Sequence, residues 1–181
     1  GKSTFFNCLL GRSRAIVADF AGVTRDYKEE ILDLKNFQIQ LVDTAGLKSS
    51  LISEQEKTIN KHTLNLINQL DIILFVLDGR MGVTLEDKEI FQVCRRLNKP
   101  TILVINKVET SVIEQRFFEE DINFFGLPNI IFVSSEHRLG IEKVFLALED
   151  ICQENKLGSV AKIESNSEKK PINIAIIGRP N

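Results

Sequence analysis

Three short runs of this sequence carry almost nothing but apolar residues: Ile72–Leu77, Thr101–Ile105 and Ile172–Ile177. Strands of that composition are buried on both faces, which happens in parallel sheets that are covered by helices on each side. Stretches with the periodicity of amphipathic helices separate these runs. Strands that alternate with helices predict an α/β domain that is doubly wound, in the right-handed sense, around a mostly parallel central sheet.

The rest of the chain supplies further elements of the same alternation. Helices are expected at residues 2–10, 54–69, 85–97, 112–125 and 141–153. The third of these begins after Thr84, with Asp87 in the position of a capping box. A hairpin is expected between 28–34 and 37–43, and another strand at 129–134. The charged side chains of 28–34 indicate a strand at the edge of the sheet.

The composition changes after the last of these helices. Residues 154–171 are polar, include the cluster Glu164–Lys170, and are typical of a linker. A chain of 181 residues is long enough for one domain with a substantial core and a tail. We therefore expect one domain over residues 1–153, a linker over 154–171, and the first strand of a second unit within 172–181.

The overall composition narrows the class of protein. Hydrophobic residues make up 43% of the chain and charged residues 27%, as in ordinary soluble globular proteins. The net charge of −2 gives no argument for nucleic-acid binding by this segment, and its apolar runs are too short to span a bilayer. Cys8, Cys94 and Cys152 are widely spaced and form no CxxC motif. We expect them to be buried, reduced thiols of a cytosolic protein.

Each end of the chain carries half of a phosphate-binding loop of the pattern G-x-x-x-x-G-K-[ST]. Gly1–Thr4 (GKST) opens a helix, and Gly178–Asn181 (GRPN) follows the last apolar strand. In such a loop, glycine permits close backbone approach, helix N-terminal amides bind phosphate oxygens, and the lysine ammonium binds the β/γ charge. Either half alone is explained as well by a helix start or a strand-to-turn junction. Together they predict a fragment of a longer protein with two nucleotide-binding domains in tandem.

The sequence Asp43–Gly46 (DTAG) closes a buried strand. An aspartate at the carboxyl end of a strand can hold Mg²⁺ through water, and the hydroxyl of Ser3 can supply another ligand. The backbone N–H of Gly46 can reach the γ-phosphate. The alternative is an aspartate that only begins a turn, which is common.

The sequence Asn106–Glu109 (NKVE) follows another buried strand, and Ser134–Glu136 (SSE) follows the next. The functional interpretation is a guanine site, with an amide on the base edge, a lysine stem over the base, and a carboxylate accepting the N1 and N2 protons. A backbone amide of the second segment would then meet O6. The alternative is a polar loop at the end of a strand. Because all these motifs follow strands in the expected order, we favour the functional interpretation.

Thr24 lies in the segment Gly22–Asp26, between the first helix and the edge strand. A threonine in a mobile loop at this place could complete the Mg²⁺ shell when a γ-phosphate is present. Taken alone, the segment is better explained as a flexible surface loop.

Together these residues resemble the translation-factor-like GTPases, and most closely the Der/EngA family of bacterial tandem GTPases. Three stretches carry the closer similarity: residues 18–26, 75–89 and 133–141. The resemblance covers nearly the whole chain and implies the P-loop NTPase fold. It further implies Mg²⁺-dependent hydrolysis of GTP to GDP, a role in assembly of the large ribosomal subunit, and a bacterial cytoplasmic location. In that layout, 1–153 is a first G domain without its first strand, and 172–181 begins the second.

The motifs and the resemblance define a set of site residues. The expected nucleotide-binding residues are Gly1, Lys2, Ser3, Thr4, Asp43, Thr44, Ala45, Gly46, Leu47, Asn106, Lys107, Val108, Glu109, Ser134, Ser135, Glu136, Gly178, Arg179, Pro180 and Asn181. The expected catalytic residues are Lys2, Thr24 and Gly46, and the expected Mg²⁺ ligands are Ser3, Thr24 and Asp43. The resemblance also implies a K⁺ ion, because Asn181 matches a loop asparagine associated with K⁺ in related GTPases.

Two residues depart from the patterns of GTPases. Glu109 stands where the family has aspartate, and its extra methylene shifts the carboxylate. Losing one charged hydrogen bond would cost roughly 1.5–3 kcal/mol, so we expect a weaker but surviving guanine preference. Leu47 stands where Ras-like proteins have a water-orienting glutamine. We therefore expect slow intrinsic hydrolysis that K⁺ or the ribosome stimulates.

Two other functions remain open from the sequence. The domain could be a regulatory binding module whose nucleotide state only positions its neighbours, or an ATP-using P-loop protein, which Asn106-Lys107 disfavours.

One structural hypothesis concerns Ile172–Ile177, which has the chemistry of the central first strand that 1–153 lacks. We expect it to occupy that vacant position and to bring Asn181 near Gly1, since the termini of a domain are often close together.

Overall fold

The computed structural model of the chain describes residues 1–11, 28–34, 37–43, 69–120, 122–157 and 171–179. Within these ranges, helices and strands alternate as the apolar pattern predicts. The expected helix at 54–69 lies outside the described residues except for Gln69, and so does the segment that contains Thr24. No helix among the described residues is both long enough and apolar enough to cross a membrane.

The described strands form one mostly parallel sheet. They are β1 (Lys28–Asp33), β2 (Gln38–Asp43), β3 (Ile72–Asp78), β4 (Thr101–Asn106), β5 (Ile130–Phe132) and β6 (Ile172–Ile177). Their order across the sheet is β1-β2-β6-β3-β4-β5. β1 is antiparallel to β2, and every other pairing is parallel. The charged strand β1 is at the edge, as predicted.

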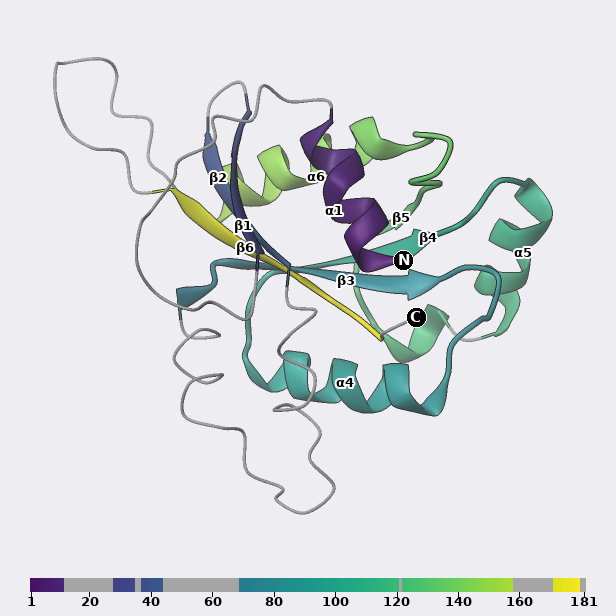
Figure 1. Cartoon of the computed structure of the whole chain (residues 1–181). Coiled ribbons are helices and arrows are strands. Elements are labelled where there is room, and N and C mark those ends of the chain that lie inside the picture. The colour runs from purple at the N-terminus through teal and green to yellow at the C-terminus, as the bar shows by residue number, and fades with distance from the viewer. Residues whose placement is uncertain (12–27, 35–36, 44–68, 121, 158–170, 180–181) are drawn as a thin grey trace, which may run out of the picture.

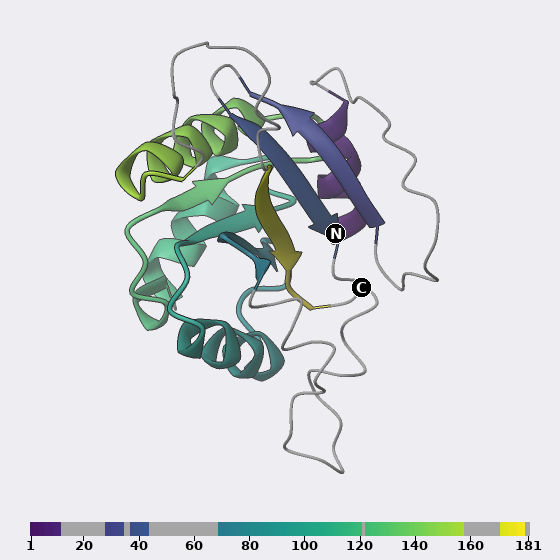
Figure 2. The same cartoon turned by 90° about the vertical axis from the view of Figure 1, so that its left-hand side faces the viewer.

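β6 is the last strand of the chain and lies in the interior of the sheet, between β2 and β3 (Figure 2). Ile174 is in register with Leu41 of β2 and with Ile72 of β3. Residues 174–176 have no exposed surface. The hypothesis that Ile172–Ile177 occupies the central position is therefore confirmed. A strand that is apolar on both faces is buried fully only where it has a neighbour on each side and helices above and below.

Helices cover both faces of the sheet (Figure 1). They are α1 (Lys2–Leu10), α4 (Leu85–Arg96), α5 (Ser111–Glu120) and α6 (Ile141–Glu154), with a 3₁₀ turn, η2, at Ile122–Phe124. α1 and α6 pack on one face, while α4, α5 and η2 pack on the other. The fold is thus three layers, with the sheet in the middle, as predicted for a doubly wound domain.

Strand β3 shows how one strand serves both layers. Ile72, Leu74 and Val76 belong to the core shared with α1 and α6. Residues 73, 75 and 77 belong to the core shared with α4 and α5. Side chains of a strand alternate between its two faces, so a continuous apolar run supplies both cores at once.

A group of phenylalanines fixes α4 and η2 on β3. The ring of Phe75 meets that of Phe91 in α4 edge-to-face, with 5.2 Å between centroids. Phe91 meets Phe125 at 4.8 Å, and Phe124 meets Phe125 at 5.3 Å. Such pairs contribute about 0.5–1.5 kcal/mol beyond the area that they bury. They hold α4 firmly under the strand whose carboxyl end carries site residues.

Most element boundaries agree with those predicted to within one residue, and two elements differ by more. The capping box of α4 is confirmed, with Asp87 N–H donating to Thr84 Oγ1 at 3.2 Å and Thr84 N–H donating to Asp87 Oδ2 at 3.0 Å. The helix predicted over 112–125 was too long: α5 ends at residue 120, and η2 leads into Gly126, whose φ of 56° ends helical structure. The strand predicted over 129–134 was also too long, since β5 stops at residue 132.

All three cysteines are buried thiols, as predicted. Burial raises the pKa of Cys94 to about 12. Burial, together with the negative charges of Asp71 and Glu149, raises the pKa of Cys152 to about 11. A thiol with such a pKa is almost wholly protonated near neutral pH and is therefore a poor nucleophile.

Candidate functional site

The parallel strands end at the edge of the sheet from which α1 starts (Figure 1). Polar residues stand at these strand ends. Asp43 ends β2, Asp78 ends β3, and Asn106 ends β4. Gly178 follows β6. Because parallel strands deliver their carboxyl ends to one edge, four segments that are distant in sequence meet there. This edge is the usual ligand site of open α/β sheets.

The two half-loops come together. The Lys2 ammonium donates to the backbone oxygen of Arg179 at 2.9 Å, and the Lys2 residue is only 7% exposed. Gly178 makes this junction possible, because a Cβ on it would lie 2.2 Å from the Val76 carbonyl oxygen. Its φ of 155° is also unfavourable for any other residue. Glycine is therefore required for the chain to pass so close to β3.

Ser3 and Asp43 form an oxygen-rich pair beside this junction. Ser3 Oγ donates to Asp43 Oδ2 at 3.3 Å, and Asp43 is 5% exposed. A hydroxyl and a carboxylate are hard oxygen ligands of the kind that Mg²⁺ prefers. The residues present thus fit a magnesium ion held by α1 on one side and by β2 on the other.

Asn106 is a buried residue at the end of β4, and its side chain makes four hydrogen bonds. Its Oδ1 accepts hydrogen bonds from Ser135 N–H at 3.0 Å, Ser135 Oγ at 2.9 Å and Lys107 N–H at 2.8 Å. Its Nδ2 donates to the Gly1 carbonyl at 3.4 Å. The side chain therefore ties the start of α1 to the loops after β4 and β5. Since an amide nitrogen carries two hydrogens, its second one is the donor that could reach a base edge.

Lys107 is anchored by a partner that the sequence motif did not identify. Its backbone is left-handed, with φ of 68°, and its Nζ is 2.6 Å from Asp78 Oδ2. Burial acts to raise the pKa of Asp78, but the hydrogen bond and charge of Lys107 and the backbone N–H groups of Arg80 and Met81 outweigh it. The net pKa of Asp78 is lowered from 3.8. The ion pair holds the Lys107 ammonium at the end of β3.

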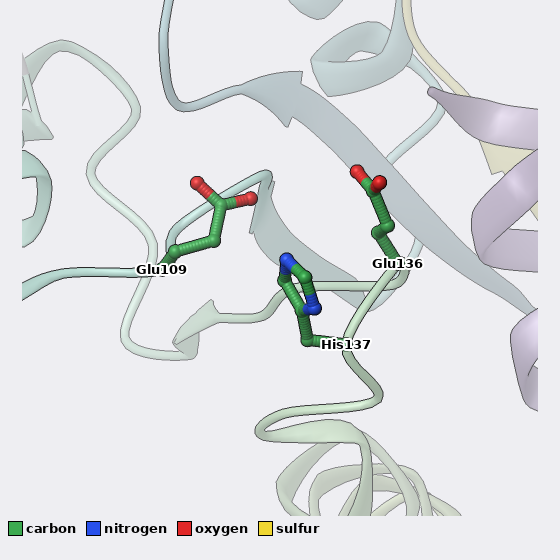
Figure 3. A group of neighbouring side chains, drawn as sticks. All are labelled: Glu109, Glu136 and His137. Atoms are coloured by element: carbon green, nitrogen blue, oxygen red, sulfur yellow. The ribbon is translucent and has the colours of Figure 1, made fainter.

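Glu109 is held from two sides. One carboxylate oxygen accepts from Ser134 Oγ at 3.4 Å, and the other is 3.2 Å from a guanidinium nitrogen of Arg80. Figure 3 shows the His137 ring between Glu109 and Glu136. The ligand atoms of these three side chains lie within 4.8 Å of one another. Glu136 and His137 are exposed, and acidic groups commonly gather at a surface without binding an ion, so this group carries no assignment of a metal.

The remaining predicted residues differ in placement. Val108 is buried and its N–H donates to the Val133 carbonyl at 3.0 Å, which holds the Asn106 loop on the neighbouring strand. Thr4 and Glu136 are exposed. The predicted residues that lie outside the described part of the chain are Thr24, Thr44, Ala45, Gly46, Leu47, Pro180 and Asn181.

A cavity joins the two halves of the site. Its lining residues are Gly1, Lys2, Val76, Leu77, Asp78, Asp87, Asn106, Lys107 and Arg179. It therefore opens between the phosphate-type loop and the Asn106 loop. The sequence motifs missed Asp78, which lines this cavity, and Arg80, which pairs with Glu109. Their position directly after a buried strand is the signal that could have found them.

The chain resembles known GTPases in sequence. The family profile described as 50S ribosome-binding GTPase matches residues 1–107. The protein named GTPase Der from Thermotoga sp. (strain RQ2) is 36% identical over an alignment that covers 100% of this chain and 40% of that protein. GTPase Der from Deinococcus deserti is also 36% identical, again over 100% of this chain and over 38% of that protein. The chain therefore spans well under half the length of these curated relatives.

Solved structures support the fold. The putative nucleolar GTP-binding protein 1 from Plasmodium falciparum superposes with a TM-score of 0.60 at 20% identity, covering 88% of this chain and 84% of that one. The G-domain of FeoB from Methanococcus jannaschii gives a TM-score of 0.56 at 20% identity, covering 84% and 90%. At this identity the similarity concerns the fold alone, and it confirms the predicted P-loop NTPase architecture. The profile match over more than half of the sequence shows that the chain belongs to the 50S ribosome-binding GTPase family.

Proposed function

We propose that this chain forms the nucleotide site of a GTP-binding and GTP-hydrolysing protein of the Der/EngA type. The observation that carries the proposal is the hydrogen bond from Asn106 to the Gly1 carbonyl. It ties the expected base-reading loop to the expected phosphate loop at one edge of the sheet. The similarity to proteins named GTPase Der supports the same function.

In this proposal, the first turn of α1 binds phosphate. Lys2 is buried with its ammonium directed at the junction of the two half-loops, where it would neutralise the β/γ-phosphate charge. Ser3 and Asp43 would hold Mg²⁺, Asp43 through water, with Thr24 as a further ligand. The ion, when bound, neutralises negative charge on the phosphates during transfer. Gly46 would place its backbone N–H on the γ-phosphate.

The loops after β4 and β5 would bind the base. Asn106 would direct its second Nδ2 hydrogen to the base edge, and the Lys107 stem would cover one face of the ring. Glu109 would accept from N1–H and the 2-amino group of guanine. The Ser135 N–H donates to Asn106 Oδ1, which keeps the loop after β5 beside the Asn106 loop. Because Glu109 is one methylene longer than aspartate, the guanine preference should be weaker than an aspartate gives.

Hydrolysis in this proposal is slow without help. Leu47 cannot orient a water molecule, so K⁺ or the large ribosomal subunit would supply the missing transition-state stabilisation. The bacterial cytoplasm is the corresponding location. The domain layout is a first G domain over 1–153, a linker over 154–171 and the first strand of a second G domain at 172–181. The burial of β6 between β2 and β3 supports the idea that the two domains have equivalent first strands.

Single-turnover hydrolysis by the full-length protein tests this function. GTP should be cleaved in the presence of Mg²⁺, faster with K⁺ than with Na⁺, and K2M should abolish cleavage at this site. Equal rates of GTP cleavage in K⁺ and in Na⁺ would contradict the proposed role of K⁺. If the protein binds nucleotide in a way that depends on Lys2 but does not cleave it, the second candidate function, a regulatory binding module, is favoured. Leu47, which stands in place of a glutamine, also favours this second function.

A further inference from the structure

The segment that follows β3 runs against the Asn106–Glu109 loop and touches it at successive residues. Asp78 pairs with Lys107 at 2.6 Å. The Gly79 N–H donates to the Asn106 carbonyl at 2.7 Å. Arg80 then pairs with Glu109 at 3.2 Å. Three successive residues, Asp78, Gly79 and Arg80, thus join the ends of the adjacent strands β3 and β4. The last of these contacts is to the Glu109 carboxylate.

Gly79 sets how closely the two segments approach. A Cβ on Gly79 would lie 2.8 Å from Val108 Cγ2 and 2.9 Å from the Asn106 carbonyl oxygen. Both distances are shorter than real carbon contacts, and one involves backbone that cannot move aside. A glycine here brings the next residue, Arg80, within reach of Glu109.

The backbone from which Arg80 projects is itself fixed. The Arg80 N–H donates to Asp78 Oδ1 at 3.0 Å, and the Arg80 carbonyl accepts from Arg116 at 3.2 Å. The Arg80 backbone is therefore held in one position, and the guanidinium reaches Glu109 from there. Its planar fork of donors is suited to orienting a carboxylate.

The Glu109 side chain needs such an orienting partner. Glutamate has one more rotatable bond than aspartate, so its carboxylate samples more positions unless neighbours restrain it. Here Ser134 holds one oxygen and Arg80 holds the other. Each carboxylate oxygen has two lone pairs, so both oxygens keep capacity to accept from a ligand.

We propose that Arg80 is a specificity-determining positioning residue, which holds the Glu109 carboxylate in the orientation that accepts both N1–H and the 2-amino group of guanine. Arg80 acts through Glu109 and does not itself contact the base. In effect it limits the loss of alignment that the longer side chain of glutamate causes. The inference rests on the proposed guanine-binding function of this loop.

The partial exposure of the Arg80–Glu109 pair predicts that it affects nucleotide binding more than folding stability. The Arg80 side chain is 56% exposed and that of Glu109 is 20% exposed. Ion pairs at such exposure contribute little to folding stability, because water and salt screen them. Loss of Arg80 should therefore change nucleotide discrimination while leaving the thermal unfolding temperature nearly unchanged.

The discriminating measurement is the ratio of affinities for GDP and inosine diphosphate, which lacks the 2-amino group. Equilibrium binding is measured on the full-length protein. Binding that remains in the K2M variant is assigned to another site. The wild-type ratio should be roughly tenfold, as expected for one charge-assisted hydrogen bond. R80M should lower this ratio about fivefold. R96M, which removes an exposed arginine from the far end of α4, should leave it within about twofold.

Two further variants separate orientation from charge. R80K keeps the positive charge but lacks the planar fork, so it should restore only part of the ratio. In an E109D background, R80M should change the ratio less than about twofold, because aspartate has one bond fewer to restrain.

The outcomes are distinct. A wild-type protein that binds ADP as tightly as GDP would overturn the guanine site itself. A guanine-selective wild type whose GDP-to-inosine-diphosphate ratio is unchanged or higher in R80M and R80K would overturn the role of Arg80 alone. An equal loss of GDP, inosine diphosphate and ADP affinity in R80M would also overturn it, since that result indicates attraction of phosphate by charge.

Discussion

Lys2 and Arg179 are 177 positions apart in the chain, and the Lys2 ammonium donates to the Arg179 carbonyl at 2.9 Å. This contact exists because β6 lies between β2 and β3 and ends beside the start of α1. The two residues come from segments at opposite ends of the sequence. In this structure the position of the Lys2 ammonium therefore depends on β6 as well as on α1.

Shortening a buried side chain of β6 should destabilise the whole domain. I174A removes most of a side chain with no exposed surface from the middle of the sheet. We expect a loss of about 2–5 kcal/mol in the free energy of unfolding, measured by urea denaturation. L146A, at a position that is 60% exposed in α6, is the control and should change it by less than about 0.5 kcal/mol. Equal, small effects of the two variants would contradict the central placement of β6.

Alanine at Gly178 should disrupt the junction of the half-loops. Its Cβ would overlap the Val76 carbonyl, which is backbone of β3 and cannot yield cheaply. G178A should lower the free energy of unfolding by about 1–3 kcal/mol and weaken nucleotide binding. G11A is the control, since Gly11 has a φ of −67° and a Cβ there meets the end of a flexible arginine. A stable G178A protein with unchanged nucleotide affinity would be inconsistent with this geometry.

The ion pair of Asp78 and Lys107 should give a defined pH dependence. The folded-state pKa of Asp78 is lowered from 3.8, so its stabilising contribution is complete above that value and is lost as the pH falls through the folded pKa. The difference in unfolding free energy between wild type and D78N should thus stay constant from about pH 7 to pH 5 and shrink below 3.8. K107M should show the same narrowing, and a difference that instead grows in acid would refute the pairing.

The buried thiols should resist alkylation. The pKa of Cys94 is about 12 and that of Cys152 about 11, so hardly any thiolate is present at neutral pH. Cys8 is 5% exposed. Iodoacetamide should label native protein slowly and unfolded protein at all three cysteines, as followed by mass spectrometry. An exposed cysteine introduced by Ser111→Cys should react at once and serves as the control. Rapid labelling of Cys94 in the native state would contradict its burial.

Much of the architecture could be predicted from the sequence, because it depends on local pattern. The apolar runs that became β3, β4 and β6 are buried on both faces wherever they pair, so their central positions follow from composition. The capping box at Thr84 and Asp87 is equally local. The end of α5 was less predictable, since Ile122, Phe124 and Phe125 continue the apolar pattern and only the 3₁₀ turn before Gly126 ends the helix.

The site was predictable in its residues more than in its contacts. The motifs identified Asn106, Lys107 and Glu109 but assigned them to a base, whereas their present partners are Ser135, Asp78 and Arg80 with Ser134. These partners come from other strands, and their distances are set by tertiary packing. Glu109 as a departure from the family pattern could be read from the sequence, but its pairing with Arg80 could not. Thr24, Gly46, Leu47 and Asn181 lie outside the described residues, and their roles stay predictions.

The central claim is that this edge of the sheet binds guanine nucleotides, and competition binding tests it most directly. A fluorescent GDP analogue bound to the full-length protein in Mg²⁺ is displaced by GTP, GDP, ATP or ADP, with K2M reporting binding elsewhere. We predict that the guanine nucleotides compete at least about tenfold better than the adenine nucleotides, the discrimination of one charged hydrogen bond, and that K2M loses the signal of this site. Equal competition by ATP and GTP would contradict the account.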